Sequence, residues 1–240
     1  MKRIVGISVL VITLLLPATN FAAEDQIGVY VAPKLALALV LMSDVQLAGN
    51  GTMPGGTWNA RTSGSTAETS FGGALAVGYD FSKRFDIPVR AELEYFLLSN
   101  VTAKADKTPD GATAAVKQQQ DYQISTLLVN AYYDIHLNSR FTPYVGLGLG
   151  MGFIETKWTG SDKWGNSGNG APTTVNNVIW GIGGGVGFAV NDTMTVDAGY
   201  RLVSLGSVKT KNYSGMDISG GGRTGSLFVN EFMLGLRFTF

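Results

Sequence analysis

The sequence predicts an all-β fold, an eight-stranded antiparallel transmembrane up-and-down β-barrel with long extracellular loops and short periplasmic turns. Three observations support this fold class. Apolar residues recur at every second position in eight stretches, the connections between these stretches alternate between short and long, and the one long apolar run stands at the N-terminus. Because a strand sends successive side chains to opposite faces, this alternation predicts strands with one apolar face.

The N-terminal segment, residues 1–23, is interpreted as a secretory signal peptide, and residues 24–240 as the outer-membrane barrel domain. Two basic residues precede an apolar run from Ile4 to Leu16, and a stretch of small residues ends at Ala23. The competing interpretation is a membrane-anchor helix, but this run is shorter than the ~20 residues that span a bilayer. We therefore expect an exported chain that enters a membrane only as strands.

The C-terminal stretch, Leu227–Phe240, carries a strand pattern that favours a membrane barrel. One alternating set is almost wholly apolar, and the other is small or polar and contains Glu231 and Arg237. In a soluble sandwich the apolar set would face a second sheet. A soluble protein gains little from a terminal aromatic residue on that face, whereas membrane barrels place aromatic residues at their interface girdles. Phe238 and Phe240 therefore resemble the C-terminal assembly signal of outer-membrane barrels.

Seven further stretches show the same alternation, and each is about as long as a tilted strand needs to cross a bilayer. In the fifth and sixth strands of the chain, large apolar residues alternate with glycine. The seven predicted strands are Ile27–Leu41, Thr69–Phe81, Ile87–Leu98, Tyr122–Ile135, Pro143–Phe153, Val178–Val190 and Met194–Leu205.

The predicted connections separate a barrel from a sandwich. Tight turns follow the second, fourth and sixth strands, and long polar segments follow the first, third, fifth and seventh. Bacterial barrels have short turns on the periplasmic side, longer loops outside and an even strand number. A soluble sandwich has no reason to sort its loops in this way. The predicted long loops are about 43–68, 100–121, 155–175 and 207–225.

The polar face of each strand is predicted to point into the barrel, because an arginine at mid-depth on the lipid side would cost ~2–4 kcal/mol. Buried charges must pair, and an eight-stranded barrel is only just wide enough for its own side chains. We therefore expect a salt-bridged plug, with the glycine stripe making room for it; the alternative is that glycine hollows out a water path or pocket. The predicted interior charge network is Lys34, Arg90, Glu92, Glu94, Asp197, Arg201, Glu231 and Arg237.

Composition argues against several kinds of site. Basic and acidic residues balance at a formal charge of +0, so nothing indicates a nucleic-acid surface. The chain has no cysteine and a single histidine, His136, in a predicted periplasmic turn. A Ser-His or Asp-His arrangement therefore cannot be built at the outer end, and no cluster has metal-ligand spacing. We expect no enzyme activity, no metal and no cofactor.

The segments Pro88–Tyr95 and Phe141–Gly148 resemble strands of the small eight-stranded outer-membrane barrels of the opacity-protein and surface-antigen family. The resemblance implies a bacterial outer-membrane protein whose surface-exposed loops act as an antigen or adhesin, or as an envelope structural element. It also implies contact with outer-membrane lipid, periplasmic chaperones and the barrel-assembly machinery, with a host or surface ligand at the loops. The alternative is a narrow porin-like channel for small solutes, which the glycine-lined wall favours.

Overall fold

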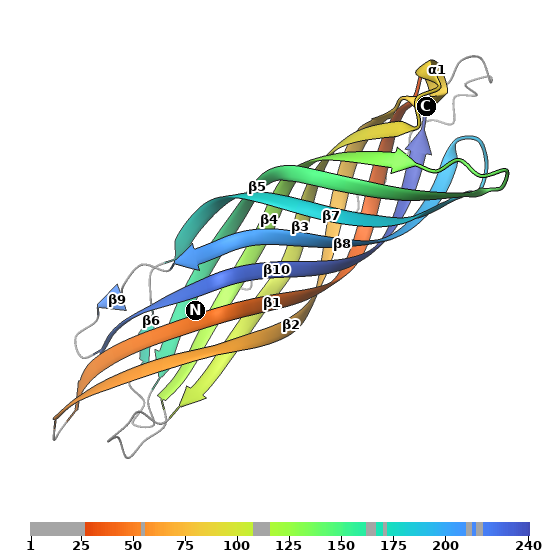
Figure 1. Ribbon diagram of the computed structural model, residues 1–240. Coiled ribbons are helices and arrows are strands. Elements are labelled where there is room, and N and C mark those ends of the chain that lie inside the picture. Colours follow the sequence, from red (N-terminus) through yellow and green to blue (C-terminus); the bar gives the residue numbers. More distant parts are fainter. Residues whose placement is uncertain are drawn as a thin grey trace, which may run out of the picture.

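The chain forms one closed antiparallel β-barrel, as Figure 1 shows. The computed structural model describes residues 27–53, 56–107, 116–161, 167–169, 172–209, 213–214 and 218–240. Each strand pairs with the next along the wall, and the first pairs with the last, so the sheet has no free edge where it closes. The wall strands are β1 (Val29–Met53), β2 (Gly56–Asp80), β3 (Val89–Lys107), β4 (Val116–Asp134), β5 (Phe141–Ser161), β7 (Thr173–Ala189), β8 (Met194–Lys209) and β10 (Ile218–Thr239).

The predicted fold class is therefore confirmed for the described part of the chain. Two short strands, β6 (Ser167–Asn169) and β9 (Tyr213–Ser214), pair with the outer ends of β5 and β10. Among the described residues, no helix has the length and apolar character of a membrane-crossing helix. The predicted signal peptide, residues 1–23, lies outside the described residues.

A belt of apolar side chains covers the outside of the barrel. Leu35, Val129 and Leu147 are 71%, 61% and 65% exposed, and they alternate along their strands with inward-facing residues. The belt ends near Leu41 on β1 and Phe228 on β10, which are directly paired. Side chains of this kind on the outside of a barrel match the hydrocarbon core of a bilayer. We refer to this zone as the lipid belt.

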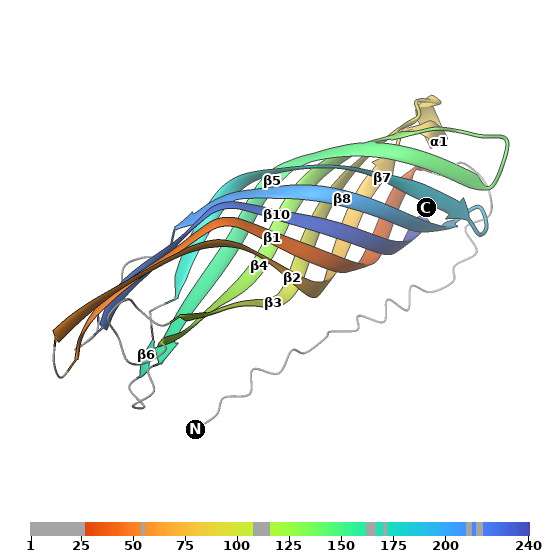
Figure 2. The same cartoon turned by 60° about the horizontal axis from the view of Figure 1, so that its bottom comes forward.

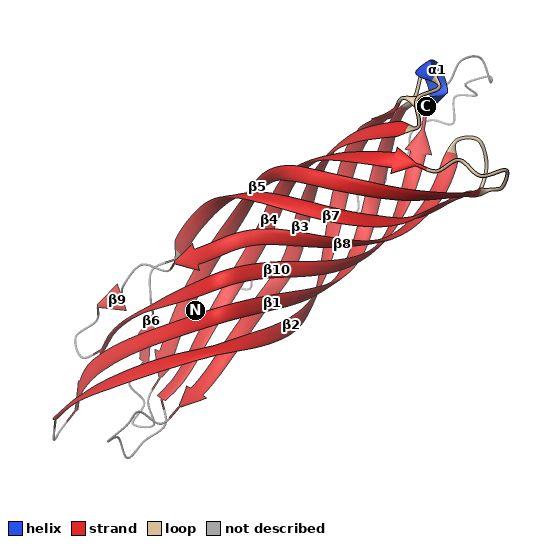
Figure 3. Cartoon of the chain, in the orientation of Figure 1, coloured by secondary structure: helices blue, strands red, loops and turns tan. Residues whose placement is uncertain are grey.

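The short turns gather at one end of the barrel, where Figure 3 also shows the helix of the described chain. This helix, α1 (Ser82–Phe85), follows Asp80, whose carboxylate accepts hydrogen bonds from the Ser82 N–H at 2.9 Å and the Ser82 hydroxyl at 2.6 Å. The C-terminus closes at the same end, since the Phe240 N–H donates to the Val29 carbonyl at 2.9 Å. By the pattern of bacterial barrels, this end is periplasmic.

At the opposite, extracellular end the predicted loop boundaries are wrong. The segment 43–68 was expected to be a polar loop, yet β1 continues to Met53 and β2 begins at Gly56. The other predicted loops are likewise shortened, because β3 runs to Lys107 and β5 to Ser161. Ladder hydrogen bonds join backbone groups whatever the side chains are. Beyond the lipid, a strand therefore needs no apolar face, and its sequence looks like a loop.

Three irregularities in strand pairing lie just above the lipid belt. The register shifts between Met42 and Val45 on β1, between Leu98 and Val101 on β3, and between Thr224 and Phe228 on β10. A bulge adds a residue to one strand, so the inward and outward positions exchange beyond it and the strand bends. Met42 is accordingly buried inside, and Val45, three residues later, also packs against the interior.

Towards its extracellular end the wall divides into two sheets. Pairing of β2 with β3 ends at Gly72 and Leu98, and pairing of β7 with β8 ends at Trp180 and Ser204. One sheet continues as β8, β10, β1 and β2, and we call its part formed by residues 45–53, 56–69 and 218–224 the β1–β2–β10 extension. The other continues as β3, β4, β5 and β7. Figure 2 shows the β1–β2 hairpin projecting away from the ends of β3 and β4.

The lipid belt leads to a stability prediction. Replacing Leu147, which faces outward near mid-depth, with arginine should lower the free energy of unfolding in a bilayer by ~2–4 kcal/mol. The matched control is Gln123→Arg, an exposed outward position above the belt, which should change it by less than about 1 kcal/mol. Urea unfolding in lipid vesicles measures both, and equal effects of the two substitutions would contradict the assigned membrane position.

Candidate functional site

The periplasmic half of the barrel interior holds a continuous chain of ion pairs. Lys34 Nζ lies 2.5 Å from Glu92 Oε1 and 2.6 Å from Glu94 Oε2. Arg201 Nη2 lies 2.7 Å from Glu94 Oε1 and 2.6 Å from Glu231 Oε2. All five side chains are at most 11% exposed. Two cations thus lie among three carboxylates from strands β3 and β10, far from bulk water.

Two further arginines each pair with one aspartate. Arg90 donates from Nε and Nη2 to both carboxylate oxygens of Asp134, at 2.7 and 2.9 Å. Arg237 donates to Asp197 in the same forked way, at 3.1 and 3.2 Å. This two-bond geometry is the strong form of an arginine–carboxylate pair. The structure thus brings each of the eight residues predicted for the interior network into an ion pair.

Asp134 was missed when the interior network was predicted. The eight residues predicted for the network do not include it, so the prediction omitted the partner of Arg90. The signal was present in the sequence, because Asp134 stands between the outward residues Tyr133 and Ile135. Period-two alternation alone directs its carboxylate inward.

Aromatic side chains and glycine shape the space around the charges. The guanidinium of Arg90 lies over the rings of Tyr132 and Tyr144, at 4.9 and 5.1 Å from their centroids. The Tyr132 ring rests directly on Gly146, where any Cβ atom would collide with it. Glycine at this position therefore makes room for a large ring from the neighbouring strand, whereas the prediction was that glycine makes room for the charged side chains of the plug.

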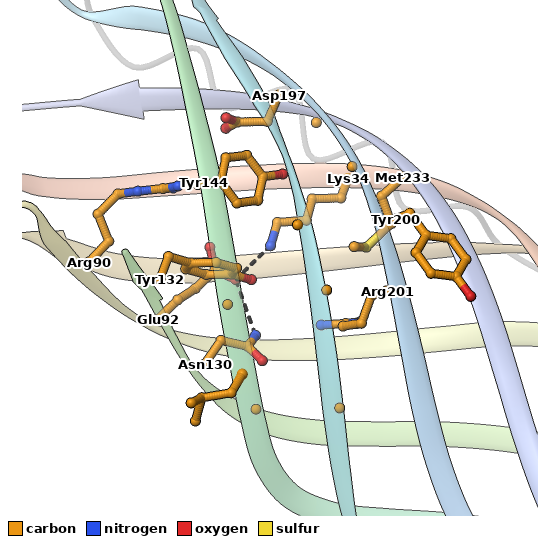
Figure 4. Close-up of a pocket in the computed structure, with 18 residues that line it drawn as sticks. Lys34, Arg90, Glu92, Asn130, Tyr132, Tyr144, Asp197, Tyr200, Arg201 and Met233 are labelled. Atoms are coloured by element: carbon orange, nitrogen blue, oxygen red, sulfur yellow. Dashed lines mark hydrogen bonds and ion pairs between the residues drawn. The ribbon is translucent and has the colours of Figure 1, made fainter. Parts of the chain in front are cut away.

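A small cavity of ≈ 30 Å³ remains between these groups. Figure 4 shows Lys34, Glu92 and Asn130 converging from different strands on this space, with Arg201 beside them. Asn130 donates to Glu92 at 3.3 Å, and so does the Tyr132 hydroxyl, at 3.2 Å. Since one water needs about 10–15 Å³ by this measure, the cavity has room for only a few molecules of that size.

The extracellular half of the interior is apolar, which corrects the expectation that polar residues fill the whole barrel. Leu128 and Ile179 occupy inward positions of strands whose inward residues were expected to be polar or glycine. The bulges add further apolar residues to the interior, because they turn Val101 and Val208 inward. We call this cluster the apolar plug; its larger buried members are Val40, Met42, Phe96, Leu98, Val101, Tyr122, Ile124, Leu128, Ile154, Ile179, Val203, Leu205, Val208, Leu227 and Val229.

Side chains close the two places where the wall divides. Between β2 and β3, the Ser99 hydroxyl donates to the Phe71 carbonyl at 2.6 Å, and the Ser70 hydroxyl donates to the Ser99 carbonyl at 2.9 Å. Between β7 and β8, the Asn177 amide donates to the carbonyls of Leu205 and Ser207 at 2.7 and 2.9 Å. These bonds replace ladder hydrogen bonds at the point where strand pairing stops.

The remaining predicted residues lie at the periplasmic end. His136 is exposed in the turn after β4, at the end of the barrel opposite the extensions. No group of three metal-ligating side chains occurs within the ranges that the structure describes. Phe238 and Phe240 face outward at the periplasmic rim, 37% and 40% exposed. The chemistry of the interior is therefore charge pairing and packing.

Comparison with known proteins agrees with this architecture. Residues 8–222 match the family model described as the outer membrane protein beta-barrel domain. Outer membrane protein PagN of Salmonella typhimurium (strain LT2) is 29% identical to this chain, and the alignment covers 100% of both. Opacity protein opA60 of Neisseria gonorrhoeae is 28% identical over 42% of this chain and 52% of its own length. Putative adhesin RC1281 of Rickettsia conorii is 27% identical, over 72% and 68% respectively.

The charge network leads to a second stability prediction. Replacing Arg201 with methionine leaves Glu94 and Glu231 close together with one cation fewer, which should lower the free energy of unfolding by about 3–5 kcal/mol. Arg237→Met is the matched comparison and should cost less, because its partner Asp197 is 14% exposed and keeps some hydration. Urea unfolding in vesicles measures both. Adding Glu231→Gln to Arg201→Met should recover part of the loss, and no recovery would contradict the pairing.

Proposed function

Because the chain belongs to the outer membrane protein β-barrel family, we propose that it is a non-enzymatic surface adhesin whose extracellular extensions bind a host or surface ligand. The barrel lies in the bacterial outer membrane, in contact with its lipid. One observation carries the proposal: β1 and β2 remain paired from the lipid belt out to Met53 and Gly56. A strand needs only about ten residues to cross a bilayer, so the rest of this hairpin extends beyond the extracellular face of the membrane.

The relatives support a binding role. PagN is named as an outer membrane protein, opA60 as an opacity protein and RC1281 as a putative adhesin. The extensions also have the physical form of a binding surface, since the backbones of their strands are already paired. Ordering a flexible loop on binding costs free energy that such a surface has already expended in folding.

The absence of catalysis in this proposal rests on where the reactive groups lie. His136, the single histidine of the chain, stands at the periplasmic end. The buried carboxylates Glu92, Glu94 and Glu231 are each engaged by a cation at 2.7 Å or less. Carboxylates held in this way stabilise the barrel and are poorly placed to act as general acids or bases on a surface substrate.

The route to the membrane is part of the same proposal. A signal peptide at residues 1–23 would direct export, and periplasmic chaperones and the barrel-assembly machinery would then receive the unfolded chain. Phe238 and Phe240 stand on the outward face of the last strand, at the rim where β10 meets β1. Exposed aromatic side chains on the closing strand suit recognition before closure and anchoring at the membrane interface afterwards.

A narrow pore, the alternative suggested by the glycine stripe, is disfavoured by the apolar plug. Buried side chains of Phe96, Leu128 and Leu205 lie across the extracellular half of the interior, where an ion would lose its hydration without gaining ligands. We therefore expect the folded protein to be silent in planar bilayer recordings. Steady unitary currents from the unmodified barrel, absent after mock reconstitution, would contradict this assignment.

The adhesion proposal is tested by trimming the extensions. In one variant the hairpin tip, residues 46–63, is replaced by a short turn, and in a second all extracellular extensions are cut back to the bulges. Bacteria that carry the second variant should bind host cells no better than bacteria lacking the protein. The closed barrel, verified by its resistance to unfolding in detergent, serves as the control. If bacteria that carry the fully trimmed barrel bind host cells as well as bacteria with the unmodified protein do, the proposal is wrong.

A further inference from the structure

One strand edge of the extracellular extension is open. Above Gly72, β2 pairs with β1 on one side, and the described strand pairings give it no partner on the other. Gly64, Ser65, Ala67 and Thr69 are exposed, and Thr66 and Glu68 are partly exposed. An unpaired edge presents a row of N–H and C=O groups with the spacing of a strand. The segment 64–69 of β2, here called the β2 edge, is such a row.

Two of the other edges that arise where the wall divides, on β3 and on β8, are irregular or occupied by a side chain. On β3, the register shift between Leu98 and Val101 marks a bulge, and two lysines follow, at Lys104 and Lys107. Bulges and lysines are devices by which proteins discourage pairing at an edge. On the far side of the barrel, the Asn177 amide occupies the carbonyls of Leu205 and Ser207.

The β2 edge lacks these devices. From Gly56 to Phe71, β2 contains no proline and no lysine, and the one register shift in its pairing with β1 places the extra residue on β1, where Ser43 and Asp44 stand against Ser65. Threonine and serine are frequent along it, and threonine in particular favours extended backbone. The strand is therefore held in the geometry that pairing requires, with one row of main-chain groups directed away from β1.

We propose that the β2 edge binds an extended polypeptide segment of a surface protein, which adds as a further strand to the β1–β2–β10 extension. Only another extended main chain repeats donors and acceptors at the spacing of this row. A glycan or a lipid headgroup has no such repeat. Affinity would come from the main-chain ladder, and the small residues Gly64, Ser65 and Ala67 of the edge would allow many partner sequences.

A second copy of this chain in the same membrane fits the edge poorly. Barrel strands tilt by about 35–45° from the membrane normal. Two barrels with the same orientation would bring their β2 strands together at roughly twice that angle, about 70–90°, and strands crossing so steeply share few ladder bonds. The occupant is therefore a segment free to align itself, as an unstructured tail or loop is.

The test uses the full chain in lipid nanodiscs and a short synthetic peptide of alternating threonine and valine with a lysine at each end. Amide hydrogen exchange within residues 64–69 should slow when this peptide is added, and exchange within residues 101–107 of β3 should not. The control peptide has the same sequence with alternate main-chain nitrogens methylated, which removes the donors of one edge, and it should give no protection. Equal protection by both peptides, or none by either, overturns the proposal.

Two adjacent substitutions locate the donors on the protein. Neighbouring residues of a strand direct their N–H groups to opposite sides, so one of Thr66→Pro and Ala67→Pro removes an edge donor and the other a donor to β1. The edge variant should retain slow exchange in β1 and bind the peptide about tenfold more weakly, since one main-chain hydrogen bond is lost. Unchanged peptide binding in both variants overturns the proposal, and the methylated peptide keeps the test valid if one variant fails to fold.

This inference rests on the proposed adhesion, and the two can fail separately. Host-cell binding that persists in the edge variant, together with no effect of the peptide on exchange, removes the β2 edge and leaves adhesion standing. If the peptide protects residues 64–69 but bacteria with the trimmed protein still bind host cells, the adhesion proposal fails and the β2 edge proposal stands. The edge would then bind extended peptide, and another protein would mediate adhesion.

Discussion

Inside a bilayer, no water is present to hydrogen-bond an exposed backbone N–H or C=O group, and the rest of this structure depends on that constraint. Along the lipid belt the ladder is closed, with β1 paired to β10 and β2 paired to β3 as far as Gly72 and Leu98. The wall divides before the belt ends, because the outward apolar residues Phe71 and Val178 lie beyond the last pairs at Gly72 and Trp180. Side chains such as Ser99 and Asn177 occupy the first carbonyls beyond the closed part.

The barrel interior also has two parts, a charged half and the apolar plug. The charged half lies within the membrane, where each cation is fixed by carboxylates and the glycine wall allows the long side chains to reach one another. The apolar plug lies towards the outside, where the charges would otherwise meet water. An ion pair is strengthened when water is kept away from it, provided that all its members are satisfied. The plug thus covers the network, and the network fixes which strands face each other.

Sequence reasoning succeeded within the belt because one rule operates there. Period-two alternation placed Leu147 outside and Arg201 inside, and the charges that it gathered are paired in the structure. The rule fails beyond a bulge, since one added residue exchanges the faces, and a bulge such as that after Met42 has no sequence mark of its own. The extensions were mistaken for loops for a related reason: apolar alternation records contact with lipid and not the existence of a strand.

Extending strands rather than loops has a consequence for recognition. A loop presents side chains and hides its backbone groups in local turns, whereas an extended sheet presents a rigid backbone row wherever its outermost strand lacks a neighbour. In this chain the row falls on β2, because β1 is covered on both sides by β2 and β10. Two features place it there: pairing of β2 with β3 ends at Gly72, and the register shift on β3 begins at Leu98. A surface that selects main chain over side chain follows from the way this barrel leaves the membrane.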